Sequence, residues 1–502
     1  MLHKKLHIPI NLSLDEVNDY ELNNEIISKI QNLEKYKLSS IVDLFKNYFS
    51  NKVSEIIKKK LYYFFDEIIP IIFESKYKKE GFYQLLRFTN EIAFNFPFLD
   101  ALTMNKFVYK NLAKVFLFSG YVTNLVTENV KILDILQPDY AVRLNGNISF
   151  YKIMFDKIKT NILNEEELLD TLRQNHRLLK FQILFALINK EICIERASKE
   201  FSLLAQATID IALKIVEEQI SKKYQIDDLK FTIIAYGRFA NYSMTSNSDL
   251  DLVFIYEDVI DNAKSMRKIY IELFRQLIKV LSAKTTEGFM YEVDTKLKPS
   301  GKKGPVACTY ENFKDYHQKK SFSWEKLALR KTRVINQNDL SLKISELLKK
   351  LIAIPIFEKS IANEINMMRT NIKEDKNNIT KKDKFKWFET KYVGGGQRDI
   401  EFLNFFYNQK LPLIEQHEIE KKILLNKKME KLFFNIDQVV NISFLEEKQN
   451  TLPSNAIDLI ISEVDEKDLG SLKASVNLGK SQIYKNLNQI IESFDRSLVK
   501  NE

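Results

Sequence analysis

The sequence predicts an α+β protein that is mostly helical, with one α/β segment between two helical regions. Three observations favour this fold class. The chain has 502 residues but only 12 glycines and 9 prolines, too few for the many turns of a β-barrel or β-sandwich. Apolar residues recur at helical spacing through most of the chain, and alternation with period two is confined to its middle. The length is typical of about three domains.

Residues 1–200 are expected to form a helical N-terminal domain. Apolar residues follow a near-helical repeat along this region, for example at 178–187. Pro70, Pro97 and Pro138 are expected near helix ends, because proline cannot donate a hydrogen bond inside a helix. No combination of residues in this region is typical of a catalytic site. A packed helical domain is therefore the prediction.

The repeat changes in the middle of the chain. Apolar residues alternate with polar or small ones in three short runs, at 229–235, 250–256 and 291–297. Such alternation, with β-branched and aromatic residues, is typical of β-strands. A helix is expected between the second and third runs, from Ala263 to Ser282. Residues 201–335 are therefore expected to form the α/β domain.

Residues 336–502 are expected to form a C-terminal helical bundle, because the helical repeat returns there. One segment interrupts the repeat. Thr370 to Lys384 is almost wholly polar and rich in Lys, Asp and Asn, so a solvated loop is expected. The glycine run Gly394–Gly396 follows this loop.

The composition excludes several classes of protein and of binding partner. The 76 Lys+Arg and 67 Asp+Glu residues give a formal net charge of +9, which permits an anionic ligand such as a nucleotide but does not demand nucleic acid. Cys193 and Cys308 are too few for a disulfide framework or a zinc cluster. No apolar stretch reaches the roughly 18–20 residues of a membrane span, and the start lacks a signal-peptide core. A cytoplasmic protein with neither a membrane nor a nucleic-acid partner is expected.

Asp249 and Asp251 are the sharpest chemical signal in the sequence. On a strand both side chains point to one face, because side chains alternate with period two. Two carboxylates on one face repel each other, and a divalent cation relieves this repulsion. Carboxylate oxygens are the ligands that Mg²⁺ prefers. The pair alone is weak evidence for a metal site, so the interpretation depends on the residues around it.

Two further features strengthen the signal. Gly237 follows a predicted strand, where a glycine lets backbone N–H groups approach a phosphate closely. Asp294 lies in another predicted strand and has two interpretations: it coordinates a metal ion beside the first two acids, or it forms a buried ion pair with Lys296 or Lys298. The combination resembles polymerase-β-type nucleotidyltransferases, in which two metal ions about 3.5–4 Å apart clamp the attacking and leaving oxygens.

Four ordered motifs resemble the glutamine synthetase adenylyltransferase/deadenylylase family. They are Ala235–Asn241 (AYGRFAN) leading to Ser248–Leu252 (SDLDL), Tyr291–Gly301 (YEVDTKLKPSG), Trp324–Val334 (WEKLALRKTRV) and Gly395–Phe402 (GGQRDIEF). The similarity covers roughly residues 85–410. Typical members of the family resemble two fused copies of this motif set, whereas the chain carries it once. The resemblance therefore implies one half of such a protein.

The resemblance also implies roles for individual residues. Asp249 and Asp251 would bridge two Mg²⁺ ions, and Asp294 would bind the ion nearer the nucleophile and help to take its proton. The phosphates of ATP, the substrate, would be cradled by Gly237 and Ser248 with help from Arg238.

More basic residues are candidates for binding the nucleotide. Lys296 and Lys298 are expected on the same strand face as Asp294, where they would contact phosphates or tune that acid. Arg330 and Arg333 are expected to form one stripe with Lys326 on a helix. Phosphate contact, a solvated face and pairing with nearby acids all remain open for this stripe.

Asp399 and Glu401 are expected to open a helix, where the dipole favours acids. Binding of nucleotide or target is implied for them only by the resemblance. Departures from the family pattern occur at Ala240 and Asn241, where the family has paired glycines. Lys296 and Lys298 replace two arginines, which keeps the charge but loses bidentate phosphate geometry. The three carboxylates of the pattern are kept.

The function implied is transfer of AMP from ATP to a tyrosine of glutamine synthetase, which regulates nitrogen assimilation, by two-metal catalysis. Two alternatives stay open: phosphorolytic removal of AMP from adenylylated glutamine synthetase, and a non-catalytic regulator that binds nucleotide. The resemblance also implies a PII-type signalling protein as a partner.

Overall fold

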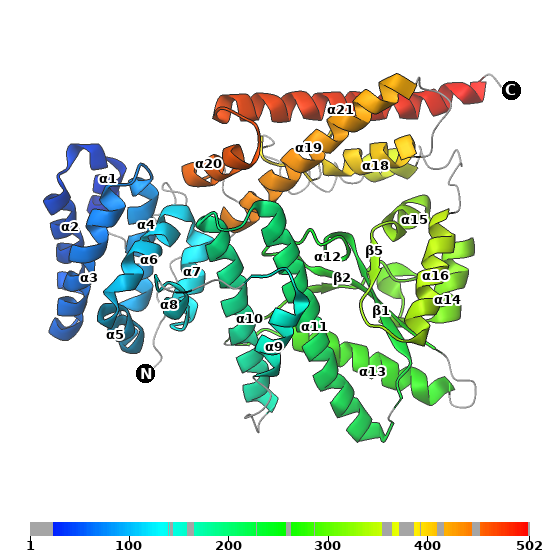
Figure 1. Ribbon diagram of the computed structural model, residues 1–502, viewed down its shortest axis with the longest axis horizontal. Helices are drawn as coiled ribbons and strands as arrows, with labels where there is room; N and C mark the ends of the chain where they lie inside the picture. Colours follow the sequence, from blue (N-terminus) through cyan, green and yellow to red (C-terminus); the bar gives the residue numbers. More distant parts are fainter. Residues whose placement is uncertain are drawn as a thin grey trace. The chain divides into compact units, whose positions relative to one another are not determined.

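The computed structural model describes the ranges 24–138, 140, 144–157, 165–226, 228–257, 263–285, 287–353, 364–370, 386–391, 393–408, 416–443 and 452–499. Helices dominate, and the strands join in one five-stranded sheet, which confirms a mostly helical α+β protein (Figure 1). The predicted solvated loop lies almost entirely outside the described residues. None of the described helices is both long and apolar enough to cross a membrane.

The chain divides into two compact units, and each contains more than one stretch of sequence. The first unit comprises Met1–Arg143, Arg177–Ala197 and Gln438–Leu469, and the second comprises Leu144–His176, Ser198–Asp437 and Gly470–Glu502. The division into consecutive domains at 1–200, 201–335 and 336–502 stays a prediction.

The first unit is helical. Its helices include α1 (Asn24–Gln31), α2 (Leu38–Ser50), α3 (Glu55–Phe73), α4 (Lys78–Ile92), α5 (Phe96–Met104), α6 (Tyr109–Phe118), α7 (Gly120–Glu128), α8 (Ile132–Ile135) and α20 (Ser454–Glu463). Apolar side chains at helical spacing bury one face of each; in α2 they are Ile41, Phe45, Tyr48 and Phe49. Pro97 lies in the first turn of α5, as expected, but Pro70 lies inside α3, in its last turn.

The sheet of the second unit has the strand order β3-β2-β1-β5, and β4 also pairs with β2. Its strands are β1 (Phe231–Tyr236), β2 (Leu250–Tyr256), β3 (Val293–Asp294), β4 (Ala307–Thr309) and β5 (Thr332–Val334). β1 runs antiparallel to β2 and β5, whereas β3 and β4 run parallel to β2. The sequence predicts β1 and β2 but misses β4 and β5, because three residues are too few to show a repeat.

Both faces of the central strands are covered. On one face, α13 (Ala263–Ser282), whose predicted bounds are confirmed, stacks Phe274 on Phe254 and Tyr270 on Tyr256, with ring centroids 4.4 and 4.7 Å apart. The other face packs on α14 (Tyr310–Lys319), α15 (Ser323–Leu329) and α16 (Asp339–Ala353). This second face forms a cluster that includes Ile234, Val253, Ile255, Leu340, Ile344 and Leu347. The sheet is therefore a rigid base for the residues at its ends.

The second unit contains further helices, of which α12 (Gly237–Ala240) lies between β1 and β2 in sequence. The others are α9 (Ile148–Asp156), α10 (Glu165–Ile188), α11 (Ile194–Tyr224), α18 (Gln397–Asn408), α19 (Gln416–Ser443) and α21 (Leu469–Val499). Of these, α10, α11, α19 and, by its first residue, α21 continue across the boundary of the units. Gly395, just before α18, has φ +74°, and a Cβ at this position would overlap the carbonyl oxygen of Lys480 in α21. The start of α18 is therefore fixed against the backbone of α21.

We expect Gly395→Ala to lower the free energy of unfolding by about 4 kcal/mol or more, because its new methyl group meets backbone. Gly301→Ala is the matched control. Gly301 also has a positive φ, of +55°, but the nearest atom to its Cβ would be 3.8 Å away. Its cost is therefore only the backbone strain, about 1–2 kcal/mol. Urea denaturation measures both variants, and equal losses would contradict the close packing at Gly395.

Candidate active site

Strand pairing brings the predicted acids together. β2 and β3 are parallel, and Asp251 is the register partner of Asp294. Neighbouring residues in register on adjacent strands project to the same face of a sheet, so their carboxylates lie side by side. Asp249 is exposed and lies one residue before β2 begins. The structure therefore gathers the three acids at one end of the sheet.

The charges of these acids are coupled. Burial raises the pKa of Asp251 to about 6, and the negative charges of Asp294 and Asp249 act in the same direction. A carboxyl with this pKa is a group whose ionised form is disfavoured by its surroundings. Perturbation of this kind is typical of functional sites.

Asp294 is engaged by a lysine two residues further along the chain. Its Oδ2 lies 2.5 Å from the Lys296 Nζ, and its Oδ1 accepts a hydrogen bond of 2.7 Å from the Lys296 backbone N–H. The ion pair of the second interpretation is therefore observed with Lys296, but it is not buried as predicted. The pair is partly exposed, with side-chain exposures of 23% for Asp294 and 59% for Lys296, so solvent reaches the lysine.

The expectation that Lys296 and Lys298 extend one strand face with Asp294 is wrong. β3 ends at Asp294 and the chain turns, because only Val293 and Asp294 pair with β2. Lys298 is buried, its Nζ donates to the Thr295 carbonyl at 3.0 Å, and burial lowers its pKa. Lys298 therefore stabilises the turn after β3.

The three acids fit a hard divalent cation by their chemistry. Carboxylate oxygens suit Mg²⁺, and a cation would favour the ionised form of Asp251, which burial and the negative charges of Asp294 and Asp249 disfavour. Within the described part of the chain, no three His, Cys, Asp or Glu side chains are already arranged to hold a metal ion. A cation that uses Asp294 would have to replace the Lys296 ammonium.

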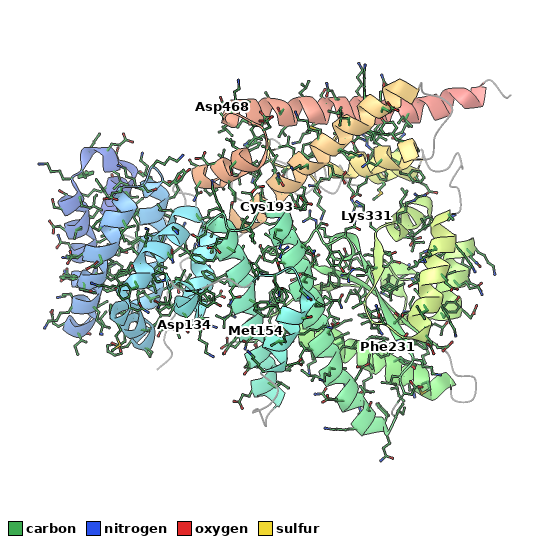
Figure 2. The ribbon with its side chains drawn as sticks, viewed as in Figure 1. Asp134, Met154, Cys193, Phe231, Lys331 and Asp468 are labelled. Atoms are coloured by element: carbon green, nitrogen blue, oxygen red, sulfur yellow. The ribbon has the colours of Figure 1, made fainter. Side chains whose placement is uncertain are left out.

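Gly237 places the backbone against these acids. It begins α12, directly after β1, with φ +60°, and a Cβ at this position would lie 3.0 Å from Asp251 Oδ2. Both the left-handed backbone and the close approach require glycine here. The Gly237 N–H is not available to a ligand, because it donates to the Lys331 carbonyl at 3.0 Å. Figure 2 labels Lys331 at this end of the sheet and Phe231 at the opposite end of β1.

The other predicted phosphate ligands near Gly237 have partners within the chain. Ser248 Oγ accepts from the Thr245 N–H at 2.8 Å. Arg238 Nη2 lies 2.6 Å from Asp437 Oδ2 of α19. These contacts fix the segment between β1 and β2, and Arg238 would have to exchange its partner to bind a phosphate.

Arg330 and Arg333 do not share a helix face, so the predicted stripe with Lys326 is wrong. α15 ends at Leu329, Arg330 caps it, and Arg333 lies in β5. The Arg330 guanidinium lies 5.2 Å from the centroid of the Phe405 ring. Arg333 donates to backbone and side-chain oxygens of the turn and of α11: Phe239 O, Ala240 O and Gln206 Oε1. Through these hydrogen bonds Arg333 fixes the backbone of α12, which begins at Gly237.

Two cations that sequence reasoning missed form ion pairs with Glu401, and the charge of a third, Lys391, acts on it. Lys331 Nζ lies 2.8 Å from Glu401 Oε1, and Arg398 Nη1 lies 3.3 Å from Glu401 Oε2. Burial would raise the pKa of Glu401, but Lys331, Arg398 and Lys391 hold it below its usual value. Lys391 and Arg398 also oppose the rise in the pKa of Asp251, so their charges reach the acids. The third motif contains Lys331 and the fourth contains Arg398 and Glu401, so these two motifs were the signal that could have found them, whereas Lys391 lies outside the four motifs.

Asp399 has a structural role, as its position at the start of a helix predicts. It is buried, and its Oδ2 accepts from the Gly395 N–H at 2.7 Å and from Arg369 Nη2 at 3.0 Å. It thereby fixes the glycine turn before α18, which in turn places Arg398 and Glu401.

Comparison with known proteins agrees with the motifs. Residues 109–348 match the family model described as glutamate-ammonia ligase adenylyltransferase. A protein of Brucella melitensis biotype 1, named bifunctional glutamine synthetase adenylyltransferase/adenylyl-removing enzyme, is 32% identical over 250 residues, which cover 48% of this chain and 25% of the relative. A relative of the same name from Bartonella quintana is 32% identical over 254 residues, covering 49% of this chain and 26% of the relative.

A third relative of this name, from Rhodopseudomonas palustris strain TIE-1, is 25% identical over 362 residues, covering 66% of this chain and 36% of the relative. In these three relatives the matched segment spans between 25% and 36% of their length. Residues 109–348 of this chain are therefore similar to the glutamate-ammonia ligase adenylyltransferase family, which confirms the resemblance that the motifs predict.

Proposed function

We propose that this chain transfers AMP from ATP to a tyrosine hydroxyl of glutamine synthetase and releases pyrophosphate. The observation that carries this proposal is the register pairing of Asp251 with Asp294, with Asp249 beside them, in a segment that matches the family model. The relatives named above are adenylyltransferases and adenylyl-removing enzymes of glutamine synthetase, which supports this substrate. A polymerase-β-like domain and a PII-type partner remain predictions.

Asp249, Asp251 and Asp294 would hold two Mg²⁺ ions, which neutralise charge on the α-phosphate and on the departing pyrophosphate when bound. Asp294 accepts the proton of the tyrosine, whose hydroxyl is mostly protonated at neutral pH because its ordinary pKa is about 10. Lys296 serves as the counterion of Asp294 until a cation takes its place. Gly237 leaves the space beside Asp251 that a side chain would fill.

Phosphorolytic removal of AMP is the second candidate, because the relatives' names include an adenylyl-removing activity. In that direction an oxygen of inorganic phosphate bonds to the α-phosphorus, the bond from the phosphorus to the tyrosine oxygen breaks, and the products are ADP and the free tyrosine, whose oxygen regains a proton. The two are separated by incubating the chain either with glutamine synthetase and ATP or with adenylylated glutamine synthetase and phosphate. Mass spectrometry of the glutamine synthetase then shows gain or loss of one adenylyl group.

Asp251→Asn should lower the rate of AMP transfer by about 10²–10³-fold, because a carboxylate that would hold the Mg²⁺ ions, which stabilise charge on the reacting phosphate, is lost. Asp315→Asn is the control, since Asp315 is an exposed acid of α14 paired with Lys319. Transfer is followed by intact-protein mass spectrometry of glutamine synthetase with ATP and Mg²⁺. A rate in Asp251→Asn equal to that of the wild type would contradict the proposed role of the acids.

The raised pKa of Asp251 also predicts a dependence of stability on pH. The ordinary pKa of an aspartate is about 3.9, so between about pH 4 and pH 6 folding has to keep a proton that the unfolded chain releases. In the presence of a chelator, the wild type should therefore lose stability relative to Asp251→Asn as the pH rises through this window. Thermal unfolding at pH 5 and pH 7.5 measures the difference, which should be larger at pH 7.5.

Addition of Mg²⁺ at pH 7.5 extends the same experiment. Because a ligand stabilises the state that binds it, Mg²⁺ should raise the midpoint of the wild type but not that of Asp251→Asn. A difference between the two proteins that stays constant with pH, or an equal response to Mg²⁺, would argue against a shared charge at this site.

A further inference from the structure

The guanidinium of Arg333, in β5, donates hydrogen bonds through all three of its nitrogens. Nε donates to the Ala240 carbonyl and Nη2 to the Phe239 carbonyl, both at 3.3 Å, and Nη1 donates to Gln206 Oε1 at 2.8 Å. A guanidinium is suited to this, because its donors lie in one rigid plane. One side chain therefore connects β5 with the end of α12 and with α11.

Two aromatic rings also lie close to this guanidinium. Its distance to the ring centroid is 5.0 Å for Phe239 and 4.4 Å for Tyr242, a range at which a ring attracts a cation. Tyr242 has a φ of +55°, a backbone conformation that is unfavourable for residues other than glycine. We call residues 237–242 the α12 turn. Arg333 therefore contacts the α12 turn where its backbone is least favourable.

Gln206 orients Arg333 and is itself oriented by an acid. Its Nε2 donates to Asp210 Oδ1 at 2.8 Å, one helical turn further along α11. Because a carboxylate only accepts and a guanidinium only donates, a neutral amide can bridge the two in one orientation alone. Gln206 is buried, with 5% exposure, and Asp210 also pairs with Lys152 Nζ at 2.7 Å. Contacts within the chain therefore fix the position of Arg333.

The α12 turn borders the acids at its other end. Gly237, the first residue of the turn, has a φ of +60°, and a Cβ there would lie 3.0 Å from Asp251 Oδ2. The Asn241 N–H donates to the Gly237 carbonyl at 3.2 Å, so the two ends of the turn are hydrogen-bonded to each other. A displacement at the end that Arg333 contacts would therefore also move Gly237 relative to Asp251.

We infer that Arg333 is a positioning residue, which fixes Gly237 against Asp251 through the α12 turn, and that Gln206 positions Arg333. The catalytic consequence rests on the proposed function. A misplacement of about 1 Å can lower a rate about 10²-fold even when the altered residue lies away from the reacting atoms. Loss of Arg333 should therefore slow the reaction without weakening the binding of ATP. Direct contact of Arg333 with a phosphate is the alternative, and it predicts weaker binding.

Steady-state kinetics of AMP transfer to glutamine synthetase separate the two roles. Arg333→Gln should lower kcat about 10–100-fold and leave the KM for ATP within about twofold of the wild type. Arg333→Lys keeps the charge but loses the planar fork, so its kcat should stay within about threefold of that of Arg333→Gln. If Arg333 contacted a phosphate, Arg333→Gln would raise the KM and Arg333→Lys would restore part of it.

Gln206→Met tests the second contact, because methionine has a similar length but no amide. Its kcat should fall about tenfold, since a hydrogen bond to a charged group is lost. The double variant should be no slower than Arg333→Gln alone, because both changes remove one interaction. Gln276→Met is the matched control, since Gln276 Nε2 also donates to an acid one helical turn away, Glu272 Oε1, at 3.0 Å. Its kcat should equal that of the wild type, as should that of Arg275→Gln, which removes an exposed arginine of α13.

Amide hydrogen exchange followed by mass spectrometry gives a readout that does not need activity. In Arg333→Gln and in Gln206→Met the amide hydrogens of the α12 turn should exchange about tenfold faster than in the wild type, because a charged contact that holds the turn is lost. Arg275→Gln and Gln276→Met should leave this exchange unchanged. Thermal unfolding of each variant verifies that the fold is retained.

The outcomes separate this inference from the proposed function. In an active chain, a wild-type kcat in Arg333→Gln, or a raised KM for ATP with kcat unchanged, would overturn the positioning role and leave AMP transfer standing. Losses that multiply in the double variant would overturn the role of Gln206. A wild-type chain without AMP transfer would overturn the proposed function. Faster exchange of the α12 turn in both variants would then still support Arg333 and Gln206 as the residues that hold it, and unchanged exchange would overturn that role too.

Discussion

The pairing of two short parallel strands is the constraint on which the site depends. Asp251 and Asp294 are register partners, so backbone hydrogen bonding between the strands holds their carboxylates on one face. The carboxylates themselves repel each other. The sheet beneath them is covered by helices on both faces, so it cannot relax to separate the charges. The cost of this arrangement is visible as the raised pKa of Asp251.

The rest of the site compensates for that concentration of negative charge. Lys296 pairs with Asp294, and the positive charges of Lys391 and Arg398 oppose the rise in the pKa of Asp251. Helix α18, which contains Arg398, is held in place from outside the sheet, since Gly395 packs its start on α21 and Asp399 accepts a hydrogen bond from the Gly395 N–H. A C-terminal helical segment thereby contributes to a site whose acids come from the α/β segment. The glycine-rich turn at 394–396 is therefore the point at which packing of the C-terminal helices fixes the position of α18.

The sequence predicts the parts of the fold that carry a repeat over enough residues. β2 and α13 are found at their predicted bounds, and the motif around Asp249 and Asp251 leads to the acids. The prediction from sequence fails where tertiary contacts decide the geometry. One example is β3, which ends after two residues, so Lys298 is buried in the following turn and does not extend a charged strand face. Lys331 was missed because its meaning depends on Glu401, which is 70 residues away in sequence. Periodicity contains no information about such a contact.

The most direct test of the central claim is a crystal structure with Mn²⁺ in place of Mg²⁺, with the ion located by its anomalous scattering. The account predicts an ion that is coordinated by the carboxylates of both Asp251 and Asp294, with the Lys296 ammonium displaced from Asp294. Asp294 still paired with Lys296, and no ion shared between the two strands, would contradict it.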